Sequence, residues 1–361
     1  MPVVPARLFD PTASHKRQKH LEREEAMERV RIGVLGAARI VSSALLAPAR
    51  KTPQVQVSAI AARDQQRAQA FARKHAIPRV VSGYEQAIAD PEIDAVYIPL
   101  PNGLHARWAI KALEAGKHVL CEKPFASNAQ EAQAMAEAAE RSRRVLMEAF
   151  HYRYHPMAAR MREVVQSGML GKIGRIETWM CFPLPEPRNI RYQYDLGGGA
   201  TMDAGCYAIN MLRLLAGDEP EVVSARARLF SPQVDRWMQA EFRFADGRTG
   251  QMTASMLSRP LFRIAARVQG DQGEMYAFNP VLPQLFHRLK IRTAQGTRIE
   301  HFTKEPTYLF QLRAFASAVL EGTPSLTTPA DAVANMRVID AVYEKAGLAL
   351  RGKEALVSVR S

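Results

Sequence analysis

The sequence has little cysteine and lacks any long apolar run. Its three cysteines, Cys121, Cys181 and Cys206, are odd in number, far apart and without a Cys-x-x-Cys pair. We interpret them as reduced thiols of a cytoplasmic protein rather than as a zinc or redox motif. No cluster of His, Cys and carboxylates has metal-ligand spacing, so we expect no metal site. The absence of a run of roughly 18 apolar residues excludes a membrane-spanning helix.

Blocks of like charge are also missing, although the chain is basic. Its 49 Lys and Arg against 36 Asp and Glu give a formal net charge of +13, spread along the sequence. Aromatic residues do not interleave with the basic ones, and no nucleic-acid reader motif occurs. We therefore expect neither a nucleic-acid nor a membrane partner. The surplus is typical of a solvated surface or of a field that attracts an anionic ligand.

A glycine turn follows the first apolar strand. Residues 31–35 read Arg-Ile-Gly-Val-Leu, and a segment with helical spacing opens after them. Strand, tight turn and helix form the start of a dinucleotide-binding unit, although Ala38 and Val41 stand where the full fingerprint has glycine. The residues expected to bind a dinucleotide here are Gly36, Ala37, Ala38, Arg39 and Ile40.

The end of the next strand, residues 55–61, bears on the choice of dinucleotide. This position contacts the ribose in such units, and it is followed by Arg63, with Arg67 one helical turn further on. Guanidinium groups suit a 2′-phosphate, which favours NADP over NAD. Asp64 suits a free ribose hydroxyl instead and keeps NAD as the alternative.

Helical and strand patterns then alternate as far as residue 149, which predicts a doubly wound parallel sheet. A rigid loop after the strand over 95–98 is expected to line the cofactor site through Leu100, Pro101, Asn102 and His105. Asn102 has a second possible role as a cap of the following helix.

Two short motifs carry the chemistry. Cys121-Glu122-Lys123-Pro124 places a lysine where a strand ends at the ligand edge of the sheet. There it can hold a proton, pair with a phosphate or orient a sugar hydroxyl. Far downstream, Asp203 and Tyr207 are four residues apart and would share one helix face.

Together with residues 152–155 (Tyr-Arg-Tyr-His), these features resemble the Gfo/Idh/MocA family of oxidoreductases over roughly residues 29–345. The resemblance implies an α/β Rossmann domain followed by an α+β domain with a large open, mostly antiparallel sheet. It also implies that Glu122 and Lys123 contribute to the NADP or NAD site. Tyr207 stands where inositol dehydrogenases carry histidine. This is similar to the tyrosine-type branch, which includes glucose-fructose oxidoreductase, dimeric dihydrodiol dehydrogenase and deoxysugar ketoreductases.

We accordingly expect a disordered or extended tail over residues 1–28, a Rossmann dinucleotide-binding domain over 29–150 and a substrate-binding and oligomerisation domain over 151–361. Extended segments dominate the last part, and the Gly197–Gly199 run is interpreted as a turn before a helix. Two closing helices are expected, of which the one over 329–347 packs on the Rossmann domain. The open sheet predicts a homodimer or homotetramer.

Proton transfer during hydride transfer needs a positioned acid or base, and Tyr207 is our candidate. Lys123 is expected to lower the pKa of this phenol and to anchor the substrate hydroxyl, and Asp203 to orient or bind the substrate. Weaker candidates for substrate contact are His151, Arg153, His155, Arg191 and Tyr192, of which His155 competes with Tyr207 for proton transfer.

The sequence thus predicts an NADP(H)-dependent dehydrogenase or reductase acting on a CH–OH carbon of a sugar or related cyclic polyol. Two other functions remain open on the same fold. One is a non-catalytic regulator that senses a dinucleotide. The other is an NAD-dependent glycoside hydrolase, which would keep its cofactor bound. Retention of both Lys123 and Tyr207 favours an enzyme.

Overall fold

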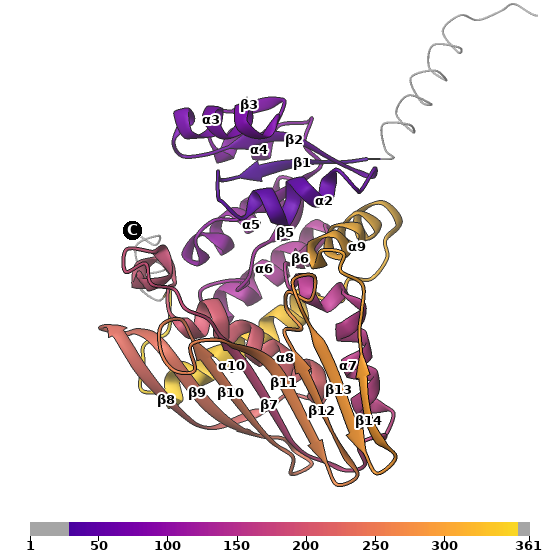
Figure 1. Cartoon of the computed structure of the whole chain (residues 1–361). Helices are drawn as coiled ribbons and strands as arrows, with labels where there is room; N and C mark the ends of the chain where they lie inside the picture. The colour runs from indigo at the N-terminus through magenta and orange to yellow at the C-terminus, as the bar shows by residue number, and fades with distance from the viewer. Residues whose placement is uncertain (1–28, 353–361) are drawn as a thin grey trace, which may run out of the picture.

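The computed structural model describes residues 29–352, which form two units, each built on one β-sheet (Figure 1). The tail expected over residues 1–28 lies outside this range. Among the described helices, none has both the length and the apolar character needed to cross a membrane.

The first unit is a six-stranded parallel sheet with the order β3-β2-β1-β4-β5-β6. Its strands are β1 (Val30–Leu35), β2 (Val55–Ala61), β3 (Arg79–Val81), β4 (Ala95–Ile98), β5 (His118–Cys121) and β6 (Leu146–Glu148). The strand order reverses between β1 and β4, so the loops after these two strands diverge and leave a crevice at the carboxyl edge. This confirms the predicted α/β doubly wound architecture.

Helices connect these strands close to the predicted positions. They are a short η1 (Ser42–Leu46) with α2 (Ala47–Ala49), then α3 (Gln65–His75), α4 (Tyr84–Ala89), η2 (Asn102–Leu104), α5 (His105–Glu114) and α6 (Ala129–Ser142). Side chains cap two of them: Asp64 accepts from the Arg67 amide and Asn128 from the Glu131 amide. Such caps satisfy amides that have no partner inside the helix.

The second unit contains an eight-stranded sheet with the order β14-β13-β12-β11-β7-β10-β9-β8. The strands are β7 (Ile173–Cys181), β8 (Glu221–Ser231), β9 (Val234–Arg243), β10 (Thr249–Ser255), β11 (Arg263–Gly270), β12 (Gly273–Phe278), β13 (Arg288–Thr293) and β14 (Gly296–Glu300). Only the β7–β10 pair in this sheet is parallel. The prediction of a mostly antiparallel second sheet is therefore confirmed.

Helices cover one face of the second sheet and also reach the first unit (Figure 1). They are η3 (His151–Tyr154), α7 (Pro156–Gln166), η6 (Thr201–Gly205), α8 (Cys206–Ala216), α9 (Thr307–Glu321) and α10 (Pro329–Lys345). Helix α10 packs against both α6 and α8, and α9 packs against η1 and η3. The end of the chain thus ties the two units together: α10 joins a buried core that spans both of them, and α9 joins a second core with strands of the first unit.

Two elements escaped the sequence analysis. Helix α7 begins directly after His155, whose ring accepts from the Met157 amide while Pro156 occupies the first helical position. We had expected extended structure after Pro156, although proline is common at this place in a helix. Strand β13 was also missed, despite the alternation of basic and apolar residues over 288–292.

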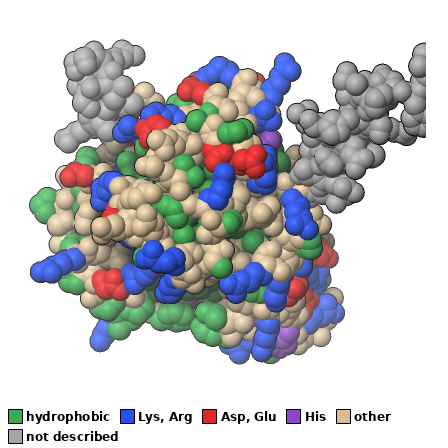
Figure 2. Space-filling view, turned by 90° about the horizontal axis from the view of Figure 1, so that it is seen from above, with side chains coloured by type: hydrophobic (Ala, Val, Ile, Leu, Met, Phe, Trp, Pro, Cys, Tyr) green, Lys and Arg blue, Asp and Glu red, His purple; other side chains and the backbone are tan. Residues whose placement is uncertain are grey.

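The basic surplus is dispersed on the face of the molecule seen in Figure 2. Lys and Arg side chains lie among acidic and apolar ones over this face. Many arginines are engaged in ion pairs, for example Arg31 with Asp94 and Arg160 with Glu300. A large part of the positive charge is therefore balanced locally.

Candidate active site

Lys123 lies where β5 ends, at the carboxyl edge of the first sheet, and reaches the second unit. Its Nζ is 3.1 Å from the Asp203 carbonyl oxygen and 3.2 Å from Asp203 Oδ1. The Nε atom of Arg191 is 2.8 Å from the other carboxylate oxygen of Asp203. One carboxylate therefore lies between two cations, and the Lys123 and Asp203 side chains are each only 12% exposed.

Tyr207 is the second residue of α8. This helix follows directly after the π-helical turn η6, which holds Asp203. The Lys123 ammonium lies over its ring, 4.8 Å from the centroid. The Tyr207 hydroxyl is 3.0 Å from Nε2 of His151. The structure thus brings together Lys123, Asp203, Tyr207 and Arg191, with His151 behind the phenol.

The charges of this cluster follow from burial and from its ion pairs. Burial alone favours neutral forms, but Lys123 and Arg191 hold the pKa of Asp203 below its usual range. Likewise burial opposes the charge of Lys123, yet Asp203 raises the pKa of the ammonium. Both groups are therefore ionised at neutral pH.

The expected effect of Lys123 on the phenol needs correction. Burial, reinforced by Tyr308 and Glu122, raises the pKa of Tyr207 well above its usual value. The Lys123 ammonium lies over the Tyr207 ring and pairs with Asp203, which offsets its positive charge. Without substrate, Tyr207 is consequently a neutral phenol, a proton donor rather than a base.

The predicted dinucleotide site lies at the turn after β1. Gly36 has φ +118°, and a Cβ atom at this residue would lie 3.0 Å from Leu100 Cδ2, so only glycine fits the turn. Arg63 is exposed immediately beyond β2. Asp64, by contrast, is the N-cap of α3, and the Arg67 guanidinium donates to the Ala37 carbonyl at 2.9 Å. Arg67 thus braces the turn, whereas Arg63 makes no ion pair within residues 29–352.

Three predicted cofactor residues have hydrogen-bond partners within the protein. His105 is fully buried, and its ring nitrogens lie 2.8 Å from the Leu100 carbonyl and 2.9 Å from the Pro124 carbonyl. Glu122 is buried and accepts from the Tyr97 hydroxyl at 2.6 Å. Asn102 does not cap α5; its Nδ2 donates to the Gly197 carbonyl of the second unit at 2.9 Å. These contacts hold the loops around the predicted cofactor site in place.

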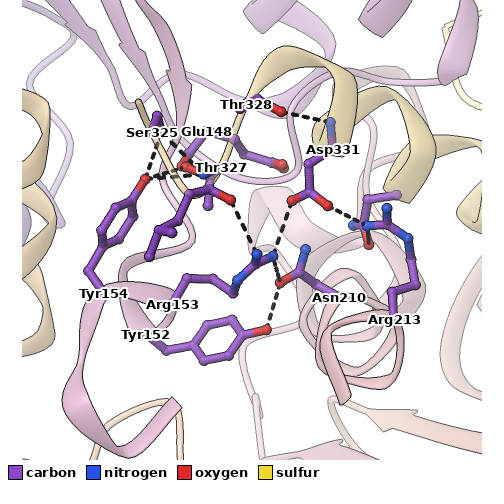
Figure 3. Close-up of polar contacts among 12 residues, drawn as sticks. Glu148, Tyr152, Arg153, Tyr154, Asn210, Arg213, Ser325, Thr327, Thr328 and Asp331 are labelled. Carbon is purple, nitrogen blue, oxygen red and sulfur yellow. Dashed lines mark hydrogen bonds and ion pairs between the residues drawn. The ribbon is translucent and has the colours of Figure 1, made fainter. Parts of the chain in front are cut away.

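Most of the weaker substrate candidates are also structural. The Arg153 guanidinium points into a polar cluster with Asn210 and Asp331, and Asp331 also pairs with Arg213 (Figure 3). His155 caps α7 and contacts the Thr303 carbonyl, so it is not placed for proton transfer. Both side chains are thus engaged by protein partners, and contact with substrate stays a prediction for them.

Tyr192 and His151 also have hydrogen-bond partners within the protein. The Tyr192 hydroxyl donates to the Leu184 carbonyl and its ring stacks on Phe230 at 4.2 Å between centroids. His151 is 1% exposed, with both ring nitrogens engaged by protein hydroxyls. Of the five, Arg191 alone reaches the Lys123 cluster with a partly exposed side chain.

Comparison with known families agrees with this geometry. Residues 30–150 match the family described as "Oxidoreductase family, NAD-binding Rossmann fold", and residues 158–276 match the GFO/IDH/MocA C-terminal domain. The chain belongs to the Gfo/Idh/MocA oxidoreductase family. Both halves of the predicted resemblance are thereby confirmed.

Members of the Gfo/Idh/MocA family similar to this chain include named sugar enzymes. The chain is 37% identical to D-xylose 1-dehydrogenase (NADP(+)) 2 of Haloferax volcanii, over 87% of this chain and 96% of the relative. It is 31% identical to a dTDP-3,4-didehydro-2,6-dideoxy-alpha-D-glucose 3-reductase of Actinomadura kijaniata, over 87% and 94% of the two chains.

A solved structure supports the fold of both units. The 3-ketoreductase KijD10 from Actinomadura kijaniata, in complex with NADP and TDP-benzene, superposes with a TM-score of 0.81 at 30% identity. The match covers 88% of this chain and 98% of that one. The arrangement of the Rossmann unit and the open sheet is therefore that of the family.

The sequence analysis predicted substrate contacts from the loop over residues 182–199, through Arg191 and Tyr192, but not its contacts with the predicted cofactor loops. Arg39 of the glycine turn pairs with Glu186 of this loop at 3.7 Å. Asn102 binds Gly197 in the same loop, as described above. A sequence signal existed in the Gly197–Gly199 run, but it indicated only a turn.

Proposed function

We propose that this protein is an NADP(H)-dependent oxidoreductase that transfers hydride to or from a hydroxyl or keto carbon of a sugar or related cyclic polyol. The observation that carries the proposal is the joint placement of Lys123, Asp203 and Tyr207 at the carboxyl edge of the Rossmann sheet. Membership of an oxidoreductase family, and relatives named as a xylose dehydrogenase and a dTDP-sugar reductase, support the substrate class.

The chain's own groups would handle the proton and the substrate oxygen. When bound, the nicotinamide supplies or accepts the hydride. In reduction, Tyr207 gives its phenolic proton to the carbonyl oxygen of the substrate, and in oxidation the phenolate form takes the hydroxyl proton. Lys123, held charged by Asp203, donates a hydrogen bond to the same substrate oxygen and stabilises negative charge there.

Arg191 and Asp203 would orient the rest of the sugar. Asp203 accepts from both Lys123 and Arg191, which fixes the direction of both cations. The half-exposed guanidinium of Arg191 retains donors that a hydroxyl or a phosphate of the substrate would accept from.

The preference for NADP over NAD rests on which side chain is free at the end of β2. Asp64 already accepts from the Arg67 amide, whereas Arg63 is exposed and has no ion-pair partner among the described residues. The 2′-phosphate of NADP would supply an ion-pair partner for Arg63.

The test is a titration of the purified protein with NADPH and NADH, followed by nicotinamide fluorescence. We expect tighter binding of NADPH, and a loss of about 1–3 kcal/mol of that preference in Arg63→Ala, as for a charge-assisted hydrogen bond. Arg73→Ala, an exposed arginine at the far end of α3, is the matched control and should behave as wild type.

Transfer of the label from 4-deuterated NADPH to a keto-sugar carbon then tests the reaction itself. Deuterium on the product carbon supports the oxidoreductase. Dinucleotide binding without transfer to any sugar would favour a sensing regulator. Glycoside cleavage with tightly held cofactor would favour the hydrolase.

We also infer the setting and the domain division of the protein. The cysteines Cys121, Cys181 and Cys206 are buried and unpaired, which supports a reducing, cytoplasmic location. We place the dinucleotide-binding domain at residues 29–150 and the substrate-binding domain from residue 151 onward, with α10 as the brace between them.

A further inference from the structure

His151 lies behind Tyr207 and is held by three elements. It begins η3, shortly after β6, and its Nε2 atom is 3.0 Å from the Tyr207 hydroxyl on α8. Its Nδ1 atom is 2.7 Å from Thr307 Oγ1, at the start of α9. The imidazole also packs on the Tyr308 ring, 4.0 Å between centroids. The ring therefore has one fixed position, with a hydroxyl at each nitrogen.

The imidazole is uncharged at neutral pH. Burial, together with the positive charge of Lys123, lowers the pKa of His151 to about 3. A neutral imidazole carries one N–H and one acceptor nitrogen, so it donates to one hydroxyl and accepts from the other. Two arrangements of the three groups are possible, and they differ in what Tyr207 can do.

If Nδ1 carries the proton, the Tyr207 hydroxyl donates to Nε2 and its hydrogen is turned away from the substrate. If Nε2 carries the proton, it donates to the phenol oxygen, and the phenolic hydrogen is free to point to a substrate oxygen. Thr307 then donates its hydroxyl hydrogen to Nδ1. Only the second arrangement leaves Tyr207 ready to give up its proton.

We propose that His151 is a positioning residue for Tyr207: its Nε2–H donates to the phenol oxygen, while the Thr307 hydroxyl donates to Nδ1. The proposal rests on the proposed acid/base role of Tyr207. When the Tyr207 O–H bond breaks and the proton moves to the substrate oxygen, the His151 N–H bond stays intact and stabilises the phenolate. Water returns a proton to Tyr207 after product leaves.

Other ionisable groups also face Tyr207. They are Tyr97 on β4, Glu122 and Lys123 just after β5, Arg191 in the loop before η6, Asp203 on η6, Cys206 on α8 and Tyr308 on α9. Glu122, Asp203, Cys206 and Tyr308 disfavour the phenolate. Lys123 lies over the ring face. His151 is thus the hydrogen-bond partner of the phenol oxygen among the described residues.

The matched variants Thr307→Val and Thr307→Ser test the proposal. Valine has the shape of threonine but cannot donate to Nδ1, whereas serine keeps the hydroxyl. We expect Thr307→Val to lower kcat about 10- to 100-fold with little change in KM. In the oxidation direction, the acid limb of the pH–rate profile of Thr307→Val should move up by about one pH unit. The reason is that the Tyr207 phenolate loses the hydrogen bond from His151, which raises the pKa of the phenol. Thr307→Ser should stay near wild type.

A second readout needs neither cofactor nor activity. ¹⁵N-histidine NMR of the ligand-free protein reports the tautomer of His151, assigned with His151→Gln. We expect Nε2–H in the wild type and in Thr307→Ser, and a reduced Nε2–H population in Thr307→Val. An Nδ1–H tautomer in the wild type, or identical kinetics and pH profiles for the two Thr307 variants, would overturn the proposal.

These outcomes separate this inference from the proposed function. If no sugar is turned over by the wild-type protein, the proposed function fails, while the tautomer still decides the hydrogen-bond assignment. If sugars are turned over but the tautomer is Nδ1–H, the oxidoreductase stands and the role of His151 falls.

Discussion

The surroundings of Tyr207 determine the protonation state in which this side chain starts a reaction. Its hydroxyl is buried, and the nearest full positive charge is neutralised by Asp203 and lies over the ring. A neutral phenol is ready to donate a proton, which suits reduction of a carbonyl. Oxidation requires deprotonation first, so we expect its rate to rise with pH more steeply than that of reduction.

Residue positions at strand ends were predictable, and their partners were not. Gly36, Arg63 and Lys123 follow apolar strands, and parallel strands bring their carboxyl ends to one edge, so local pattern was sufficient. The Tyr207–His151 bond joins residues 56 positions apart in the chain, and the Arg191–Asp203 pair joins a loop to η6. Both depend on how separate elements pack together, which no local pattern determines.

Glu148 provides a prediction of pH-dependent stability. This β6 carboxyl is 1% exposed and makes no ion pair within residues 29–352. Burial, with a contribution from Asp331, raises the pKa of Glu148 to about 8, against roughly 4.3 in an unfolded chain. Because the native state keeps a proton that the unfolded state releases, this stabilisation is complete below about pH 4 and is lost as the pH rises through 8.

Glutamine is neutral at every pH, so Glu148→Gln escapes this loss. We therefore expect the unfolding free energy of Glu148→Gln minus that of wild type to be roughly 2–4 kcal/mol larger at pH 9 than at pH 5. Urea unfolding at both pH values measures this. Glu140→Gln, exposed at the end of α6, is the control. A difference between Glu148→Gln and wild type that is independent of pH would refute the assigned charge state.

At the scale of elements, strands and helices were predictable where one face is buried. The alternation over 238–244 indicated β9, and the α3 bounds follow from the Asp64 cap and the helical spacing after it. Helix α7 was missed because His155 and Pro156 look like a break in sequence, although in the structure they start a helix.

The loop before η6 gives a prediction at this scale. Gly197 has φ +73°, and a Cβ atom there would lie 3.0 Å from the Asn102 Cβ and 3.2 Å from the Gly103 amide. The methyl group added in Gly197→Ala should therefore push the loop over residues 182–199 away from the segment that holds Asn102 and Gly103. We expect this shift to weaken NADPH binding about tenfold.

Gly217→Ala separates this effect from backbone strain. Gly217 has φ +68° and nothing within 4 Å of its ideal Cβ position. Both variants should lose about 1 kcal/mol of stability in thermal unfolding, but only Gly197→Ala should change NADPH affinity. Equal affinities would mean that the contact between the two loops does not shape the crevice.

At the scale of the whole molecule, the second sheet has one face without helices. This face carries arginine–aromatic pairs, with Arg263 3.5 Å from the Trp179 ring centroid and Arg228 5.1 Å from that of Trp237. Arginine and aromatic residues are enriched in protein–protein interfaces. We propose self-association through this face.

Light scattering at micromolar concentration should accordingly give the mass of a dimer or a tetramer. Trp237→Glu should lower that mass towards the monomer, because it buries a charge in the interface. Leu320→Glu, on α9, should not. A monomeric wild-type protein would remove the proposal without affecting the assigned reaction.

The most direct test of the account is Tyr207→Phe, measured for both turnover and NADPH binding. The account predicts that kcat falls about 10²–10⁴-fold, the usual contribution of positioned acid–base catalysis, while the NADPH Kd stays within a factor of about two. Tyr276→Phe, on the open sheet, should match wild type in both. An unchanged kcat in Tyr207→Phe would contradict the assignment of Tyr207 as the group that exchanges a proton with the substrate.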